Sequence, residues 1–262
     1  MTEPDPVRVE VGRVARIVLA RPEKQNAMTP DMGAGVARAV SLLNANDDVR
    51  VVLVEGEGKA FCAGGDFDLI RRNSERTPEQ NRLGMIDFYR SYLSILRLRV
   101  PSIAVVHGAA VGAGLAFALA CDLRLAAREA KLGANFVRVG LHPGMGCSVL
   151  LPRLVGPTVA AELLLTGRLV SGDDAAALGM VNRAVPRAEL AGAVEQLTGE
   201  LLAVAPVAAA QTKQTLLRPL LRELDEALAH EAAAQAVDFR TADLREAVAA
   251  FQSGRTPTFQ GR

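Results

Sequence analysis

Alternating apolar and polar residues open the chain, with valines at positions 7, 9 and 11 separated by charged side chains. A turn at Gly12-Arg13 and a second apolar run at 14–19 predict a β-hairpin over residues 7–19. Thr29-Pro30-Asp31 is a helix start signal, and the apolar residues after it recur at helical spacing. The pattern therefore predicts a helix over residues 30–43 with one face in the core.

Continuous apolar runs at residues 51–54 and 103–106 are typical of strands buried on both faces. A glycine-rich loop follows each run, over residues 56–66 and 108–114. After the second loop, a short apolar helix is predicted over residues 115–121. The recurrence of strand, loop and helix predicts an α/β architecture.

Beyond Pro186 the pattern becomes helical and rich in alanine. Its spacing predicts a helix over residues 190–201, a pair of helices separated at Pro219, and a last helix from Thr241 to about Phe251. Alanine-rich helices bury little within a single layer, which favours a role in subunit packing. Earlier in the chain, residues 71–82 are polar and charged and are predicted to be a mobile surface stretch.

The composition of the chain limits the kinds of molecule that the protein is expected to bind. The chain has 262 residues, of which 50% are apolar and 23% charged, so it can bury a sizeable core and is not of the disordered class. Its formal net charge of +1 supplies no basic footprint for nucleic acid or an anionic membrane, which favours small-molecule partners. The three cysteines have unrelated spacing, so neither a disulfide framework nor a zinc or other metal site is expected.

One uncharged stretch, between Pro101 and Asp122, is about as long as a membrane span. It is dominated by alanine and interrupted by glycine, so a buried strand, a loop and a short helix are the expected structure and no membrane span is predicted. The first ten residues carry neither a basic start nor an apolar run. We therefore expect a cytoplasmic protein.

The candidate chemistry lies in two loops rich in small residues: Ala60-Phe61-Cys62-Ala63-Gly64-Gly65-Asp66, and His107-Gly108-Ala109-Ala110-Val111-Gly112-Ala113-Gly114. Small residues let backbone N–H groups approach a ligand, so both loops could point donors at an anionic oxygen. The alternative is that they only permit tight turns and close packing. The dinucleotide fingerprint is incomplete because Phe117 stands at its third small position, and no phosphate-binding GxxxxGK[ST] motif exists.

With these loops in place, the chain resembles the crotonase or enoyl-CoA hydratase/isomerase superfamily over nearly its whole length. The matching stretches are residues 21–27, 60–66, 106–122, 140–152, 165–167, 177–181 and 259–261. The resemblance implies a ββα superhelical spiral over residues 1–200 and a C-terminal helical trimerisation region over residues 201–262. It further implies a homotrimer or a dimer of trimers. An acyl-CoA thioester is the implied partner, with coenzyme A as part of the substrate, no permanently bound cofactor and no metal.

The resemblance also implies a site. In the family, the thioester carbonyl lies between two backbone N–H groups, which fall on Gly65 and Ala113 of this sequence and would form an oxyanion hole. Phe251 and Arg255 would reach the site of a neighbouring subunit. Contacts to CoA or the acyl group are implied for Lys24, Ala27, Ala63, Gly64, Gly65, Asp66, Phe136 and Phe251.

The acid positions of the family are vacant here. The two glutamates of its hydratases correspond to Ala116 and Phe136, and a third acid position of its isomerases corresponds to Gly144. None of these residues moves a proton, so plain enoyl-CoA hydratase activity is not expected. His142 lies nearby in sequence and is a candidate for proton transfer, with a structural or hydrogen-bonding role as the alternative.

Two functional hypotheses follow. The first is a lyase or isomerase of fatty acid metabolism that stabilises a thioester enolate in a backbone oxyanion hole, its exact reaction unassigned. The second is a non-catalytic acyl-CoA-binding paralogue that acts as a carrier or regulator.

Overall fold

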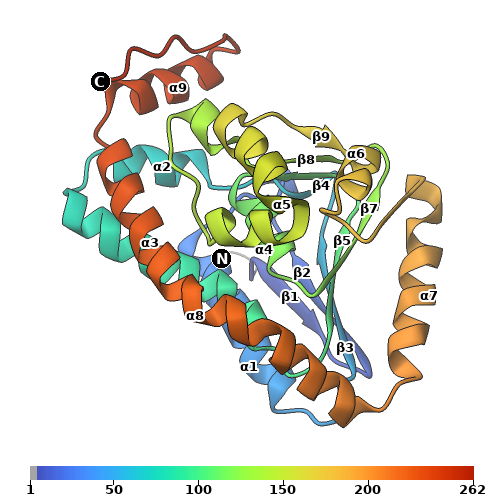
Figure 1. Cartoon of the computed structure of the whole chain (residues 1–262). Helices are drawn as coiled ribbons and strands as arrows, with labels where there is room; N and C mark the ends of the chain where they lie inside the picture. The colour runs from blue at the N-terminus through green and yellow to red at the C-terminus, as the bar shows by residue number, and fades with distance from the viewer. Residues whose placement is uncertain (1–4) are drawn as a thin grey trace.

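Two β-sheets form the centre of the computed structural model, which describes residues 5–262 (Figure 1). The larger sheet has the order β1-β2-β3-β5-β7-β10, and the smaller sheet has the order β4-β6-β8-β9. The strands of the larger sheet are β1 (Val7–Glu10), β2 (Val14–Leu19), β3 (Val51–Gly56), β5 (Ser102–Val106), β7 (Leu123–Ala127) and β10 (Arg183–Val185). Those of the smaller sheet are β4 (Ala60–Cys62), β6 (Ala109–Val111), β8 (Lys131–Gly133) and β9 (Val170–Ser171).

Successive pairs of strands build a spiral. In the pairs β3 and β4, β5 and β6, and β7 and β8, the first strand joins the larger sheet and the second joins the smaller one. Within each sheet these strands are parallel, because a connection through the other layer separates them. The ββα spiral is thereby confirmed. The short strands β4 and β6 lie inside the stretches that the hydrophobic pattern assigned to loops.

The hairpin at the start of the chain is also confirmed, since β1 and β2 are antiparallel with Val7 opposite Leu19. The first helix begins as expected at Pro30. Its N-cap is Thr29, whose side chain accepts a hydrogen bond from the Met32 N–H at 3.3 Å.

Helices fill the connections and cover both sheets. The α-helices are α1 (Pro30–Asn44), α2 (Phe67–Asn73), α3 (Pro78–Leu93), α4 (Ala113–Leu119), α5 (Cys147–Thr166), α6 (Gly172–Ala177), α7 (Leu190–Leu202), α8 (Pro206–Asp238) and α9 (Ala242–Gln252). Short 3-10 helices are η1 (Pro22–Lys24), η2 (Ser94–Arg97), η3 (Asn135–Val139) and η4 (Arg187–Glu189). In Figure 1, α8 runs alongside α3, α7 lies beside the larger sheet, and α9 lies near α2. The boundary drawn at residue 200 falls within α7.

Most residues of the polar stretch at 71–82 are exposed, so its expected surface position is confirmed, while its mobility stays a prediction. The end of α2 and the start of α3 occupy it. A capping box between Thr77 and Gln80 starts α3, and Pro78 stands in its first turn. Asn73 and Asn81 are buried, and the Asn81 Nδ2 donates to the Asn73 carbonyl at 2.8 Å. Tertiary burial of these amides was not visible in the charge pattern.

The helix pair predicted around Pro219 is a single helix, α8, which continues through that proline. A proline inside a helix removes one backbone hydrogen bond and normally bends or ends it. Here Leu220, Leu224 and Leu228 are buried against the rest of the chain on one face of α8. This packing holds the helix together across the proline.

The stretch from Pro101 to Asp122 folds as β5, β6 and α4, so the predicted buried strand and short helix are confirmed and β6 replaces part of the predicted loop. By length and composition alone, α5 is apolar enough to cross a membrane. Its helical path is broken at Gly156, which has a φ of 75° and is followed by Pro157. It also packs against α4, η3 and α8.

Candidate functional site

A small, largely apolar cavity of about 280 Å³ lies where the two glycine-rich loops meet α2, α3, η3 and the end of the chain. Gly64, Gly65 and Ala113 form part of its wall. The remaining wall is mostly apolar and aromatic, including Phe67, Ile70, Phe88, Phe136, Met145 and Phe239. The cavity is therefore a chamber for an apolar group with backbone donors along one side.

The two loops approach closely because their glycines lack side chains. A Cβ added at Gly114 would lie 2.3 Å from the Cys62 carbonyl oxygen, so any side chain there would push α4 away from β4. Gly64 has a φ of 95°, and a Cβ on it would meet the Val111 carbonyl at 2.7 Å. The glycines therefore allow close packing of the two loops, and the same loops carry backbone N–H groups beside the cavity. The two alternatives considered for these loops thus occur together.

Two backbone N–H groups face this meeting point. Gly65 follows the tight turn at Gly64, and Ala113 is the first residue of α4. Within residues 5–262, neither N–H has a hydrogen-bond acceptor. Since buried backbone donors are normally paired, two unused donors beside one cavity are suited to an oxygen atom of a ligand.

The helix that carries Ala113 is fixed at its other end. All seven residues of α4 are buried. After the helix, the Arg124 guanidinium donates to the carbonyls of Cys121 at 2.6 Å and Leu119 at 3.3 Å. A cation bonded to the carbonyl end of a helix satisfies its last acceptors and complements its dipole.

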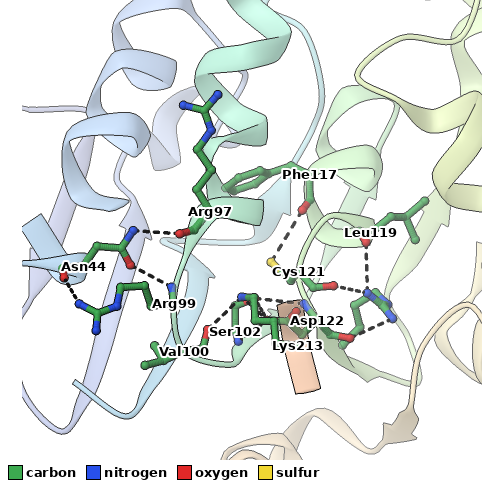
Figure 2. Close-up of polar contacts among 11 residues, drawn as sticks. Asn44, Arg97, Arg99, Val100, Ser102, Phe117, Leu119, Cys121, Asp122 and Lys213 are labelled. Carbon is green, nitrogen blue, oxygen red and sulfur yellow. Dashed lines mark hydrogen bonds and ion pairs between the residues drawn. The ribbon is translucent and has the colours of Figure 1, made fainter. Parts of the chain in front are cut away.

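Next to this end, Asp122 joins α4 to two other elements (Figure 2). Its carboxylate accepts hydrogen bonds from the Ser102 hydroxyl at 2.7 Å and from the Lys213 ammonium at 2.6 Å. The Lys213 ammonium also donates to the Val100 carbonyl at 2.9 Å. Lys213 is buried, so β5, α4 and α8 are held together by a shielded ion pair. Asp122 therefore has a structural role.

A further residue that fixes the loops was missed by the sequence analysis. Asn26 is fully buried, and its Nδ2 donates to the carbonyls of Glu57 and Ala60, both at 2.9 Å. Its Oδ1 accepts from the Arg21 N–H at 2.9 Å. The available signal was the asparagine itself, because Asn26 has a φ of 57°, a conformation that asparagine tolerates best among residues with side chains.

Only some of the residues expected to contact CoA or the acyl group line the cavity. Lys24 is exposed at the end of η1, and Ala27 is half-buried beside it. Ala63 lines the cavity with Gly64 and Gly65. Asp66 points elsewhere: it caps α2 by accepting from the Asp68 N–H at 2.9 Å, and it pairs with Arg21 at 3.3 Å.

An aromatic residue of the last helix lies at the cavity of its own chain. Phe251 on α9 stacks on Phe67 of α2 with ring centroids 4.0 Å apart and an interplanar angle of 15°. It also lines the cavity. Arg255 forms an ion pair with Glu246 of α9. In the single chain Phe251 therefore lies at the home site, whereas Arg255 does not line the cavity. Their contact with a neighbouring subunit stays a prediction.

The three vacant acid positions lie in or beside the cavity. Phe136 lines it, and Ala116 is fully buried in α4. Gly144 is buried, and a Cβ added there would lie 2.7 Å from both the Tyr89 hydroxyl and the Gln235 amide nitrogen. Among the described residues that line the cavity, none is an acid, a histidine, a lysine or an arginine.

His142 is not brought to this cavity. It is half-buried and lines a separate hollow, its Nδ1 lies 2.7 Å from the Pro143 carbonyl oxygen, and its ring packs edge-on to that of His230. Its backbone N–H donates to Asp238 at 2.6 Å. This placement fits the structural alternative for His142 better than proton transfer at the cavity.

Side chains on one face of α8 form hydrogen bonds with the segment from His142 to Ser148. Glu231 accepts from the backbone N–H of Gly146 at 2.7 Å and of Ser148 at 3.0 Å. Four residues further along α8, the Gln235 amide donates to the His142 carbonyl at 2.7 Å. Burial raises the pKa of Glu231 above its ordinary value, and the hydrogen bonds from Ser148 and Gly146 oppose this shift. The helical spacing of these residues was visible in the sequence, but their partners were not.

The cysteines near the site are inert thiols. Burial raises the pKa of Cys62 to about 12, and it also raises the pKa of Cys147 well above its ordinary value. Neither side chain supplies a thiolate at neutral pH.

A ββα spiral with two glycine-rich loops on one cavity defines the crotonase class of fold. The sequence model described as enoyl-CoA hydratase/isomerase matches residues 10–262, and the chain belongs to this family. A protein of Thermus thermophilus is 39% identical over 260 residues, which cover 97% of this chain and 100% of the relative. Crotonyl-CoA hydratase of Syntrophomonas wolfei is 32% identical, with 94% of each chain covered. The crystal structure of an enoyl-CoA hydratase from Mycobacterium avium subsp. paratuberculosis has a TM-score of 0.85 at 32% identity and covers 97% of this chain and 98% of its own.

Proposed function

We propose that the protein is an enzyme that binds an acyl-CoA thioester in the cavity and stabilises a thioester enolate. The observation that carries this proposal is the pair of unused N–H donors at Gly65 and Ala113 beside one apolar chamber. The names of the relatives point the same way, since one is a crotonyl-CoA hydratase. The acyl group enters the chamber, and the thioester oxygen accepts from both donors.

These donors act on charge that develops during the reaction. Loss of a proton next to the thioester carbonyl, or addition to a conjugated double bond, places negative charge on the carbonyl oxygen. Two fixed N–H groups in an apolar surrounding stabilise that charge without reorganisation, which contributes about 3 kcal/mol per donor. The anchors at Asn26 and Arg124 keep the two loops in register while this happens.

The reaction belongs to the lyase and isomerase classes of the family. Ala116, Phe136 and Gly144 supply no carboxylate, so we do not assign plain enoyl-CoA hydration. The apolar lining of the cavity supports this position, because hydration needs a group that holds and deprotonates water.

Replacement of Ala113 by proline tests the proposal. Proline is well accepted at the first position of a helix, so Ala113→Pro removes the N–H donor with little change to α4. Turnover is measured on a panel of 2-enoyl-, 3-enoyl- and saturated acyl-CoA thioesters, with products resolved by mass spectrometry and proton NMR. We expect kcat to fall about 100- to 1000-fold and the Kd for the thioester to change by less than about tenfold.

Ala113→Gly is the matched control, because it alters the side chain and keeps the N–H. It should retain a rate close to that of the parent protein. Gly65→Pro removes the other donor and should lower the rate in the same way. Equal rates in Ala113→Pro and Ala113→Gly would refute the oxyanion hole, and thioester binding without turnover across the panel would favour the non-catalytic carrier.

The assembly is proposed to be a homotrimer or a dimer of trimers formed through the C-terminal helices. Leu216 on α8 is 73% exposed, and Val207, Leu221 and Val237 on the same helix are also exposed. Apolar side chains in this number on one helix are typical of a subunit contact. Sedimentation velocity should give about three or six times the 27.7 kDa chain mass, and Leu216→Glu should shift it towards one. A monomer in the parent protein would contradict the proposal.

A further inference from the structure

One directly bonded pair of polar side chains lies in the largely apolar wall of the cavity. The Tyr89 hydroxyl of α3 and the Gln235 amide of α8 are 2.8 Å apart, although the residues are far apart in the sequence. Both residues line the cavity, and their exposed fractions are 1% and 2%. A buried polar pair in such a wall has a desolvation cost, so its hydrogen-bonding capacity is significant.

The neighbours of the pair fix its hydrogen positions. The Gln235 side chain lies 2.7 Å from the His142 carbonyl oxygen, which only accepts hydrogen bonds. The atom facing it is therefore the amide nitrogen, so the amide oxygen faces Tyr89. Tyr89 must then donate its hydroxyl proton to Gln235.

This arrangement leaves capacity for a ligand. The second N–H of the Gln235 amide and the lone pairs of the Tyr89 oxygen have no partner among the described residues. A hydroxyl group fits both at once, since it accepts from the amide and donates to the phenol oxygen. The Gln235 amide thus offers a donor beside the acceptor oxygen of Tyr89.

The charge around the pair selects a neutral oxygen. Glu231 and Asp238 lie on α8 within one turn of Gln235, and both contact the His142–Ser148 segment. No lysine or arginine is among the described residues that line the cavity. A carboxylate on the acyl chain would therefore be desolvated in this wall without a compensating cation.

The absence of a side chain at Gly144 leaves room for Tyr89 and Gln235 at this point of the cavity wall. A Cβ at this position would lie 2.7 Å from the Tyr89 hydroxyl and 2.7 Å from the Gln235 nitrogen. The pair occupies the space that any side chain at residue 144 would need. A side chain at residue 144 would therefore require the ends of the Tyr89 and Gln235 side chains to move.

We propose that Tyr89 and Gln235 determine acyl specificity, by binding a neutral hydroxyl carried on the acyl chain of the thioester. This inference rests on the proposed function, in which the acyl group occupies this cavity. The cavity volume of about 280 Å³ suits a short acyl chain.

The test compares three thioesters of equal chain length by isothermal titration calorimetry: hexanoyl-CoA, 3-hydroxyhexanoyl-CoA and 5-hydroxyhexanoyl-CoA. In the parent protein at least one hydroxylated thioester should bind about fivefold to tenfold more tightly than hexanoyl-CoA. Tyr89→Phe should reduce that ratio to about one. Because each ratio is measured within one variant, partial misfolding does not imitate the effect.

Tyr92→Phe is the matched control. Tyr92 is equally buried and uses its hydroxyl on the backbone of Thr29, at 2.7 Å to the carbonyl, and it does not line the cavity. It should keep the hydroxyl preference of the parent protein. Equal binding of all three thioesters to the parent protein, or an unchanged ratio in Tyr89→Phe, would overturn the specificity role and leave the proposed function standing. Absence of binding by all three would overturn both.

Discussion

At the scale of the residue, Asn26 has the largest influence on the donor loops. Its amide donates to the Glu57 carbonyl before β4 and to the Ala60 carbonyl at the start of β4, and its oxygen accepts from the Arg21 N–H. Because it is fully buried, water cannot replace these partners when the amide is removed. A short side chain thus joins the loop before α1 to the loop that carries Gly65.

Asn26→Ala should lower the free energy of unfolding by about 3 kcal/mol, since several buried backbone groups lose their partner together. Urea denaturation measures this loss. Asn46→Ala is the control, because the Asn46 side chain makes a single bond, from the Asp48 N–H at 2.9 Å. The control should lose less than about 1 kcal/mol. Similar losses in the two variants would contradict the anchoring role of Asn26.

At the scale of the element, α8 shapes the wall of the cavity by binding the segment from His142 to Ser148. Glu231 and Gln235 lie on the same face of the helix and bond to Gly146 and His142. This segment includes Met145, which lines the cavity and has a φ of 62°. These hydrogen bonds explain how Met145 keeps that conformation, because a residue with a side chain needs support from its surroundings in the left-handed region.

Glu231 should give this contact a dependence on pH. Its pKa is raised by burial above the ordinary value of 4.5, so between pH 4.5 and the raised value the folded chain holds a proton that the unfolded chain has released. Stability contributed by Glu231 is therefore greatest below this window and falls as the pH rises through it. In urea denaturation between pH 4.5 and about pH 7.5, the parent protein should lose stability relative to Glu231→Gln.

The control for this series is Glu226→Gln, which removes a charge from an exposed position of the same helix. It accounts for the general effect of net charge. A stability difference between the parent and Glu231→Gln that stays constant, or grows in favour of the parent with rising pH, would contradict the assignment.

At the scale of the whole molecule, the cavity exists only because distant parts of the chain meet. Gly65, Ala113 and Phe136 come from successive turns of the spiral, and Phe251 comes from the last helix. Figure 1 shows α9 lying near α2 at one end of the molecule. The stacking of Phe251 on Phe67 completes the wall at that end.

Phe251→Ala should therefore weaken binding of hexanoyl-CoA about threefold to tenfold, because the stacked aromatic pair and part of the cavity wall are lost. The Kd is measured by calorimetry. Phe259→Ala is the control, since Phe259 is also largely exposed and does not line the cavity. An equal effect of the two variants would show that Phe251 has no specific part in the site.

The alternating and continuous apolar runs determined the hairpin, α1 and the buried strands, because such patterns depend on local geometry and on which face meets the core. The ordered stretches from residue 21 to 261 indicated the family and the two donor loops. The continuity of α8 through Pro219 was missed, because contacts with distant elements decide it. Side-chain charge and proline content do not report those contacts.

The sequence by itself determined the strand and helix periods, the family and the glycines that let two loops approach. Tertiary structure alone decided which groups share the cavity: it placed Phe251 over Phe67, kept His142 outside, and brought Tyr89 to Gln235. The physical reason is that periodicity encodes which face of an element is buried, whereas the partner of a buried polar group depends on chain segments far away in sequence.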